Sequence, residues 1–162
     1  WLRQVLPPIG EFIPGREHAT FDVPPAPLGV LICFEDVFPA LARAHVLAGA
    51  RWLATITNDA WFGPTSAAIQ HAQASILRAV ELRVPMVRAA NTGWSGCIDD
   101  AGRWTAQVEQ GGRPLFVEGF TLCDVAITPR GSLYRAWGDW FALACLLAAV
   151  VGGWWFDTRR RA

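Results

Sequence analysis

The stretch GVLICFEDVFP, from Gly29 to Pro39, decides the fold. Residues 28–33 form an uninterrupted apolar run of strand length, and the chain then turns at Cys33 into two acidic residues, Glu35 and Asp36. Runs that are apolar throughout are typical of strands covered on both faces in α/β proteins. Ligands of such sheets bind beyond the carboxyl ends of the strands, so a thiol at this position suggests a site.

The remaining pattern alternates strands and helices. Residues 1–27 are rich in Pro and Gly and are expected to be extended loop. Apolar strand-length runs alternate with amphipathic helical segments, and turn residues then separate further strands. The order predicts an α/β fold with added antiparallel strands. The expected strands are 28–33, 52–57, 85–90, 94–99, 103–108 and 114–127, and the expected helices are 37–49 and 66–83.

Composition narrows the functional class. The 162 residues suffice for one modest domain; 52% are hydrophobic and 17% charged, against about 25% charged in an average soluble domain. Fourteen acidic residues balance fourteen basic ones, all of them Arg, so nothing indicates a nucleic-acid partner. Cys97, Cys123 and Cys145 lie in apolar runs and are interpreted as small core or membrane residues, with no metal-ligand spacing.

The C-terminal part predicts a membrane helix. Residues Trp140–Phe156 carry no charge and would extend about 26 Å as a helix, within the range of spanning segments. Tryptophans flank the run at both ends, and the tail that follows contains Arg159, Arg160 and Arg161. Arginines after a span favour the cytoplasmic side, which would place the preceding domain on the periplasmic face of a bacterial inner membrane. A buried core helix is the alternative.

Cys33 has two interpretations. As a nucleophile it would need a base or positive charge to become a thiolate, and Glu35 could orient the turn that holds it. Alternatively, Cys33 is a buried apolar residue and the two acids cap the next helix. Asp36 is assigned to that capping role in either case.

Further motifs favour the nucleophile. The chain contains in order the segments Leu6–Glu11, Cys33–Glu35, Asn58–Gly63, Gln70–His71, Arg88–Gly93 and Trp140–Phe156. In this order and spacing the pattern resembles the nitrilase superfamily and, more closely, the apolipoprotein N-acyltransferases. The resemblance implies part of an αββα sandwich at 1–135, a transmembrane helix at 136–156 and a basic cytoplasmic tail at 157–162.

The resemblance implies transfer of an acyl chain from a phospholipid to the N-terminal amine of a diacylglyceryl-cysteine apolipoprotein, through a thioester on Cys33 and without a cofactor or metal. Members use a Glu–Lys–Cys triad. The triad glutamate would lie upstream of Trp1, so we expect the chain to be part of a longer protein. The triad lysine position is Arg3, which keeps the charge but cannot shuttle a proton. Glu11 and Glu35 take supporting roles.

The substrate-binding prediction rests on aromatic residues. Phe34, next to the nucleophile, and Trp61 and Phe62, in the loop after the second strand, are expected to wall the acyl chains; a local hydrophobic plug is the alternative for the latter two. His71 is interpreted as a satisfied helix histidine outside the site. Two other functions stay open: a nitrilase-type amidase, and an inactive fragment that only binds lipid or lipoprotein.

Overall fold

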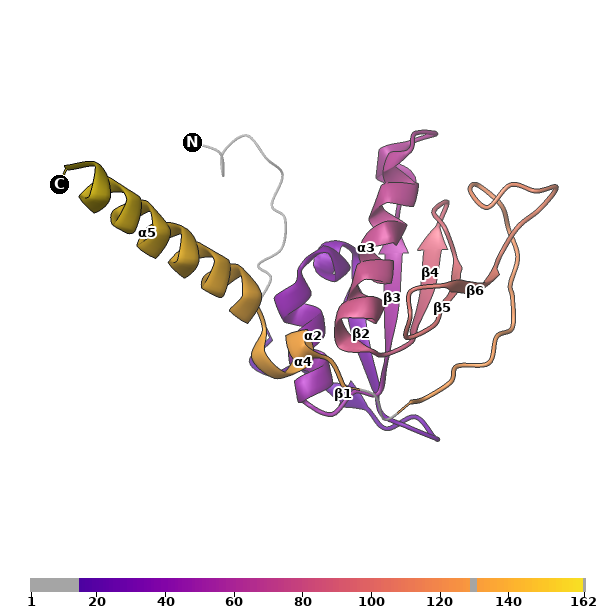
Figure 1. Cartoon of the computed structure of the whole chain (residues 1–162). Helices are drawn as coiled ribbons and strands as arrows, with labels where there is room; N and C mark the ends of the chain where they lie inside the picture. The colour runs from indigo at the N-terminus through magenta and orange to yellow at the C-terminus, as the bar shows by residue number, and fades with distance from the viewer. Residues whose placement is uncertain (1–14, 129–130, 162) are drawn as a thin grey trace, which may run out of the picture.

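A six-stranded mixed sheet forms the centre of the molecule, as Figure 1 shows. The structure is a computed structural model that describes residues 15–128 and 131–161. The strands follow one another across the sheet in chain order. β2, β3 and β4 are parallel, whereas the β1–β2, β4–β5 and β5–β6 pairs are antiparallel. Their bounds are β1 Thr20–Phe21, β2 Leu28–Ile32, β3 Trp52–Asn58, β4 Met86–Asn91, β5 Gly96–Ile98 and β6 Trp104–Gln107.

Two helices connect the parallel strands and cover one face of the sheet. α2 (Pro39–Leu47) follows β2, and α3 (Ala67–Leu82) follows β3. Both contact the sheet and each other, which Figure 1 also shows. α2 approaches β2 closely at Gly29, where a Cβ atom would lie 2.9 Å from the Cβ of His45. The predicted α/β alternation is therefore confirmed for these elements.

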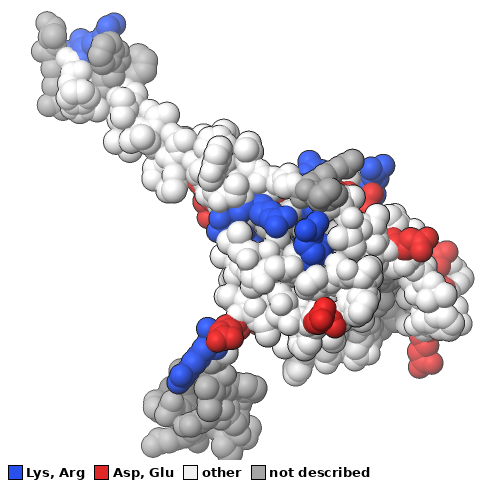
Figure 2. Space-filling view, turned by 90° about the horizontal axis from the view of Figure 1, so that it is seen from below, with Lys and Arg blue, Asp and Glu red and all other residues white. Residues whose placement is uncertain are grey.

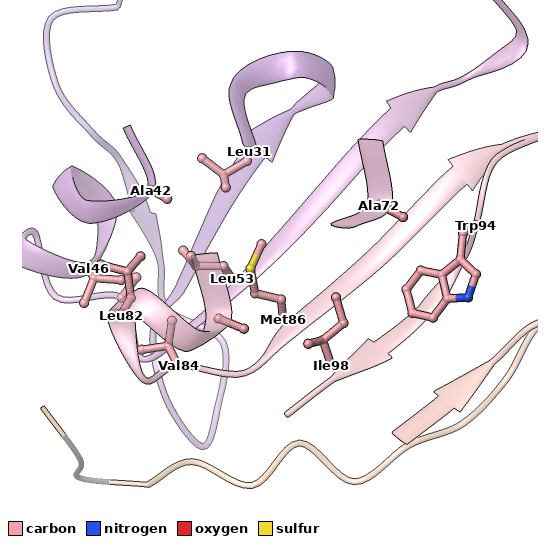
Figure 3. Packing of buried hydrophobic residues seen from close by; sticks show 12 residues of the cluster. Leu31, Ala42, Val46, Leu53, Ala72, Leu82, Val84, Met86, Trp94 and Ile98 are labelled. Carbon is pink, nitrogen blue, oxygen red and sulfur yellow. The ribbon is translucent and has the colours of Figure 1, made fainter. Parts of the chain in front are cut away.

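The core lies between these helices and the sheet. Figure 3 shows side chains from α2, α3 and strands β2 to β5 meeting in one cluster. Trp94 is fully buried and stacks on Trp104 with ring centroids 4.6 Å apart, while its Nε1–H donates to Gln107. Burial of each large apolar side chain contributes about 1.5–3 kcal/mol. The cluster comprises Leu31, Ala42, Val46, Ala50, Leu53, Ala72, Ala79, Leu82, Val84, Met86, Trp94 and Ile98.

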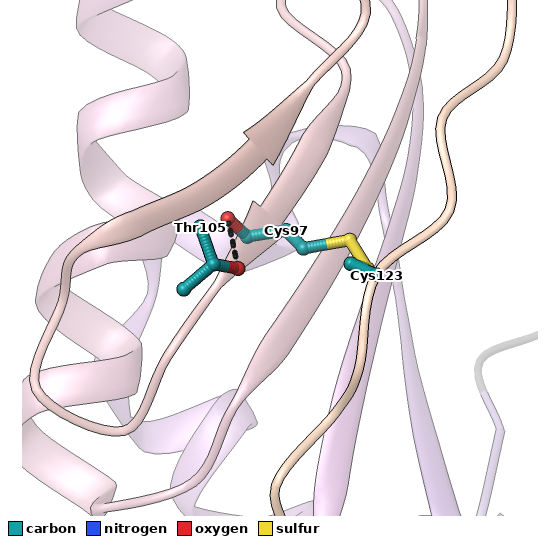
Figure 4. The surroundings of a disulfide bond; sticks show 3 residues. All are labelled: Cys97, Thr105 and Cys123. Atoms are coloured by element: carbon teal, nitrogen blue, oxygen red, sulfur yellow. Dashed lines mark hydrogen bonds between the residues drawn. A yellow bond between two sulfur atoms is a disulfide. The ribbon is translucent and has the colours of Figure 1, made fainter.

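The opposite face of the sheet differs from the prediction that both faces are covered. Within the described residues, Ile32 and Ile56 on that face are 66% and 58% exposed. The predicted strand 114–127 is wrong, because this segment runs alongside the sheet without strand pairing. A disulfide between Cys97 on β5 and Cys123 ties it to the sheet, as Figure 4 shows. The interpretation of these two cysteines as unpaired apolar residues is therefore also wrong.

A short helix, α4 (Leu133–Trp137), joins the sheet domain to the long helix α5 (Trp140–Arg161). Ser132 caps α4 at its first turn, and the Arg43 guanidinium from α2 donates to the carbonyls of Tyr134, Arg135 and Ala136. Gly138 then reverses the chain with a positive φ of 61°.

α5 projects away from the sheet domain. Figure 2 shows it as a rod that carries hardly any charge until its far end. By length and composition Trp140–Arg160 could cross a membrane, and none of its apolar window is buried in the molecule. The apolar side chains that α5 exposes require a covering of lipid or of further protein.

Candidate active site

Cys33 lies where β2 ends, at the first residue of a short 3₁₀ turn, Cys33–Val37. Its φ of +52° is in the left-handed region, which non-glycine residues adopt rarely and which is often found at functional positions. The side chain is half-buried and its thiol is free. The backbone N–H of Ile32 donates to Glu35 Oε2 at 2.7 Å, so Glu35 closes the turn around the cysteine.

Two of the three aromatic residues proposed as a wall, Phe34 and Phe62, meet at His71. Phe34 is 51% exposed, and the loop after β3 forms a second 3₁₀ turn, Ala60–Phe62, in which Trp61 is 86% exposed. The rings of Phe34 and Phe62 both lie against His71, with centroid distances of 5.3 and 5.8 Å. His71 thus brings together two of the predicted aromatics, while Trp61 projects outward.

Two predicted site residues, Arg3 and Glu11, lie outside the described residues, as does the motif Leu6–Glu11. Among residues 15–128 and 131–161, no three His, Cys, Asp or Glu side chains are grouped to hold a metal ion. A hollow of about 770 Å³ lies on the open face of the sheet, between β4, β5 and residues 119–125, and Cys33 does not line it.

Directly beneath the Cys33 turn is a closed polar cluster that the sequence analysis did not predict. Asp36 is fully buried and accepts hydrogen bonds from Arg88 on β4 at 2.5 Å and from Ser75 on α3 at 2.6 Å. Its other carboxylate oxygen lies 2.9 Å from His71 Nε2. Asp59, after β3, lies 2.8 Å from His71 Nδ1 and accepts from Arg88 at 3.2 Å.

The role assigned to Asp36 is therefore corrected. The residue that precedes α2 at its N-cap is Phe38, and no side chain caps that helix end. The Asp36 carboxylate points into the protein instead, where a guanidinium and hydroxyl compensate its burial. Arg78 on α3 also donates to the carbonyls of Asp36 and Val37, which fixes the backbone of the same turn.

The surroundings shift the pKa values of two members. Burial alone would raise the pKa of Asp36, but the hydrogen bonds from His71 and Ser75 and the Arg88 charge outweigh it, and the pKa lies below 3.8. Burial alone would lower the pKa of His71, but its hydrogen bonds with Asp36 and Asp59 prevail, and the pKa lies above 6.5. Both shifts favour the charged forms.

The sequence contained a usable signal for this cluster. Arg88 interrupts an otherwise apolar strand, and Thr55 and Thr57 line the same buried face of β3. A charge at a buried strand position requires a partner of opposite charge. A second missed pair lies at the carboxyl edge, where Asn91 Nδ2–H donates to Asn58 Oδ1 at 2.9 Å.

Gly93 shows how closely this edge is packed. A Cβ atom at Gly93 would collide with the Asp59 carboxylate, so only glycine leaves room for Asp59 in its present place. The turn after β4 therefore limits the space that Asp59 of the buried cluster can occupy.

The fold and the Cys33 turn together define an α/β protein with a free thiol at the carboxyl end of a parallel strand. The chain belongs to the carbon-nitrogen hydrolase family, whose model matches residues 1–124. A solved carbon-nitrogen hydrolase from Helicobacter pylori G27 is similar in fold, with a TM-score of 0.53 at 16% identity, over 60% of this chain and 41% of that one. The predicted nitrilase-like fold class is confirmed.

Curated relatives place the chain more finely within this family. It is 44% identical over 151 residues to the apolipoprotein N-acyltransferase of Geobacter metallireducens, covering 93% of this chain and 28% of that protein. It is 36% identical to the apolipoprotein N-acyltransferase of Thermotoga maritima, covering 85% of this chain and 27% of that one. The predicted resemblance is confirmed, and the chain spans little more than a quarter of the length of these relatives.

Proposed function

We propose that the chain carries the nucleophile of a membrane-bound acyltransferase that completes lipoproteins. The Cys33 thiolate attacks the sn-1 ester carbonyl of a phospholipid, a thioester forms, and the lysophospholipid leaves with a proton on its released oxygen. The N-terminal amine of a diacylglyceryl-cysteine protein then attacks the thioester. An amide forms, the amine loses a proton, and the Cys33 thiol is restored. Division into two steps lowers the barrier of each.

The observation that carries the proposal is the placement of Cys33. Its thiol is free and half-buried, and it sits at the edge of the sheet where ligands of α/β proteins bind. The alternative of a cysteine buried in the core has less support, because Phe34 and Ile32 on either side of Cys33 are exposed. Exposed aromatics beside the thiol are suited to acyl chains rather than to a small polar amide.

Each predicted site residue has a place in this proposal. Glu35 positions the turn through its bond to the Ile32 backbone N–H. Arg3 would supply positive charge to the oxyanion that develops on the attacked carbonyl, and Glu11 would support the pocket. A single donor to such an oxyanion contributes about 3–4 kcal/mol to catalysis. Phe34, Trp61 and Phe62 would contact the acyl chain.

The membrane placement is part of the same proposal. α5 would span the bilayer from Trp140 to about residue 156, later than the predicted start at 136 because α4 ends at Trp137, with Arg159 and Arg160 on the cytoplasmic side and the sheet domain on the periplasmic side. The Cys97–Cys123 disulfide supports this orientation, because disulfides persist in oxidising compartments and are rare in the cytosol.

The test uses the protein expressed from its natural gene, in membranes or detergent. It is supplied with a phospholipid labelled in the sn-1 acyl chain and with a synthetic diacylglyceryl-cysteine lipopeptide. We expect label to move to the peptide amine. Cys33→Ala should abolish transfer, whereas Cys145→Ala, which removes the other free thiol, should retain it. Transfer that survives Cys33→Ala would refute the proposal, and amide hydrolysis without transfer would favour an amidase.

A further inference from the structure

His71 lies between the two loops that form the candidate site. On one side are Asp36 and Phe34, which belong to the turn that holds Cys33. On the other side are Asp59 and Phe62, which flank Trp61. Each loop therefore contacts the imidazole through one carboxylate and one aromatic ring. His71 itself is buried on α3, a rigid helix packed against the sheet.

The geometry around the ring favours its doubly protonated form. Both ring nitrogens face a carboxylate oxygen, at 2.9 Å for Nε2 and 2.8 Å for Nδ1. A neutral imidazole has one N–H, so it could donate to only one of them. With its hydrogen on Nε2, the neutral ring could accept from Arg88 at Nδ1, but the 2.8 Å contact between Nδ1 and Asp59 Oδ1 would still place two lone pairs together in a buried site. An imidazolium donates to both.

The balance of buried charges around His71 also favours the imidazolium. The ionisable groups that face His71 are Asp36 from the Cys33 turn, Asp59 from the end of β3 and Arg88 from β4. Arg88 Nη2 lies 2.9 Å from Nδ1 and can donate to it only in the neutral ring; beside an imidazolium it donates instead to Asp59 Oδ2, 3.2 Å away. The Arg88 charge opposes protonation of His71, but the two carboxylates favour it. With an imidazolium, two negative and two positive charges are buried together and the cluster is neutral, as buried charges require.

We propose that His71 is a positioning residue, whose imidazolium fixes the Cys33 turn against the Trp61–Phe62 loop and so holds the thiol beside its aromatic wall. The inference rests on the proposed function, because it gives the two loops their shared task. Loss of the proton removes the ring's hydrogen bond to one of the two carboxylates, which keeps only its other donors, and the connection between the two loops is weakened. We call this connection of the two loops through the His71 imidazolium the His71 joint. The raised pKa of His71 keeps the joint formed at neutral pH, and the joint is lost as pH rises through that pKa.

This joint predicts an unusual pH dependence for thioester formation. A cysteine nucleophile alone gains rate as pH rises, because more of the thiol is ionised. If His71 holds the thiol in place, the rate instead falls at alkaline pH, once the imidazolium is deprotonated. A role confined to stability would shift the unfolding temperature and leave the form of this profile unchanged.

The experiment combines hydrogen–deuterium exchange with thioester trapping on the natural protein between pH 5.5 and 9. After correction for intrinsic exchange rates, we expect residues 33–38 and 59–63 to lose protection together as pH rises. The rate of acyl-thioester formation from labelled phospholipid should fall over the same range. His71→Gln should make both segments exchange about tenfold faster at every pH, lower the thioester rate about tenfold, and give a rate that only rises with pH.

Ser75→Ala is the matched control. It removes a hydroxyl that donates to Asp36 and accepts from Arg88, but it leaves all four ionisable groups in the cluster. We expect it to weaken protection of the Cys33 turn without changing the pH at which protection is lost. The pH series on the wild-type protein needs no substitution, so it tests the proposal even if His71→Gln does not fold.

The outcomes separate the two proposals. Protection of the two segments that does not change with pH, or an unchanged pH profile of thioester formation in His71→Gln, would overturn the role of His71. Coupled loss of protection in a wild-type protein that never forms a thioester on Cys33 would support the joint and refute the proposed acyl transfer.

Discussion

The two faces of the sheet differ in how completely the described residues cover them. The face under α2 and α3 holds a closed apolar core and a cluster in which every charge has a partner. The opposite face presents Ile32 and Ile56 to the surroundings, and α5 exposes apolar side chains along its length. Exposed apolar surface of this extent marks an interaction site. The first region is complete by itself, whereas the second needs lipid or further protein around it.

The largest effect is expected from Asp36 on the closed face. Asp36→Ala leaves Arg88 and His71 buried without one of the two carboxylates that they share. Breaking a buried ion pair on one side costs about 3–5 kcal/mol, so the denaturant midpoint of the domain should fall accordingly. Glu35→Ala removes a carboxylate one residue away that, among the described residues, accepts a hydrogen bond from the Ile32 backbone N–H alone, and it should cost about 1 kcal/mol. Equal losses would contradict the distinction between the two acids.

A matched pair on β3 compares the two faces directly. Leu53 is fully buried on the closed face and Ile56 is exposed on the open one. In the 162-residue chain, Leu53→Ala should cost about 2–5 kcal/mol and Ile56→Ala less than about 1 kcal/mol. The free energies of unfolding in detergent measure both. Similar costs would show that another surface covers Ile56.

The disulfide is the next test, because it ties the 114–128 segment to the sheet. It closes a loop with a sequence separation of 26 residues, for which the chain-entropy relation gives about 3.5 kcal/mol. Reduction with dithiothreitol should therefore lower the unfolding midpoint and expose two thiols to maleimide. The double variant Cys97→Ala, Cys123→Ala should be less stable than the oxidised protein and insensitive to reductant. Sensitivity that persists in this variant would contradict the assigned pairing.

The smallest effect concerns the pH dependence of the buried cluster. Because the pKa of His71 is raised in the folded state, its stabilisation is full below 6.5 and is lost as pH rises through the folded value. Stability should fall by up to about 1.4 kcal/mol per pH unit over that range. Asp36 has a lowered pKa in the folded state, so the stability that it contributes is lost below pH 3.8, as pH falls through that folded-state pKa. His71→Gln should remove the alkaline slope; an unchanged slope would assign it to another group.

Prediction from the sequence succeeded where the pattern was local. The apolar runs placed β2, β3 and β4 to within about a residue, and the uncharged run placed the core of α5. It failed for residues 114–127, whose apolar residues suggested a strand although a disulfide and loop contacts hold the segment. That disulfide joins cysteines far apart in the sequence, and a sequence without an alignment does not reveal such pairing.

The candidate site was predicted in part for the same reason. Cys33, Phe34 and Glu35 are neighbours in sequence and could be recognised together. Asp36 and His71 could not, because their relation depends on α3 packing over the turn. Sequence reasoning gave each of them an ordinary local role, a helix cap and a satisfied helix histidine. The fold instead combines them with Arg88 in one buried cluster.

The acyl-enzyme itself tests the central claim most directly. The natural protein is incubated with a phospholipid of defined sn-1 chain and no acceptor, digested under acidic conditions, and analysed by mass spectrometry. The account predicts that the peptide containing Cys33 gains the mass of that acyl chain and loses it on treatment with neutral hydroxylamine, which cleaves thioesters. An unmodified Cys33 peptide, with the acyl chain on another residue, would contradict the account.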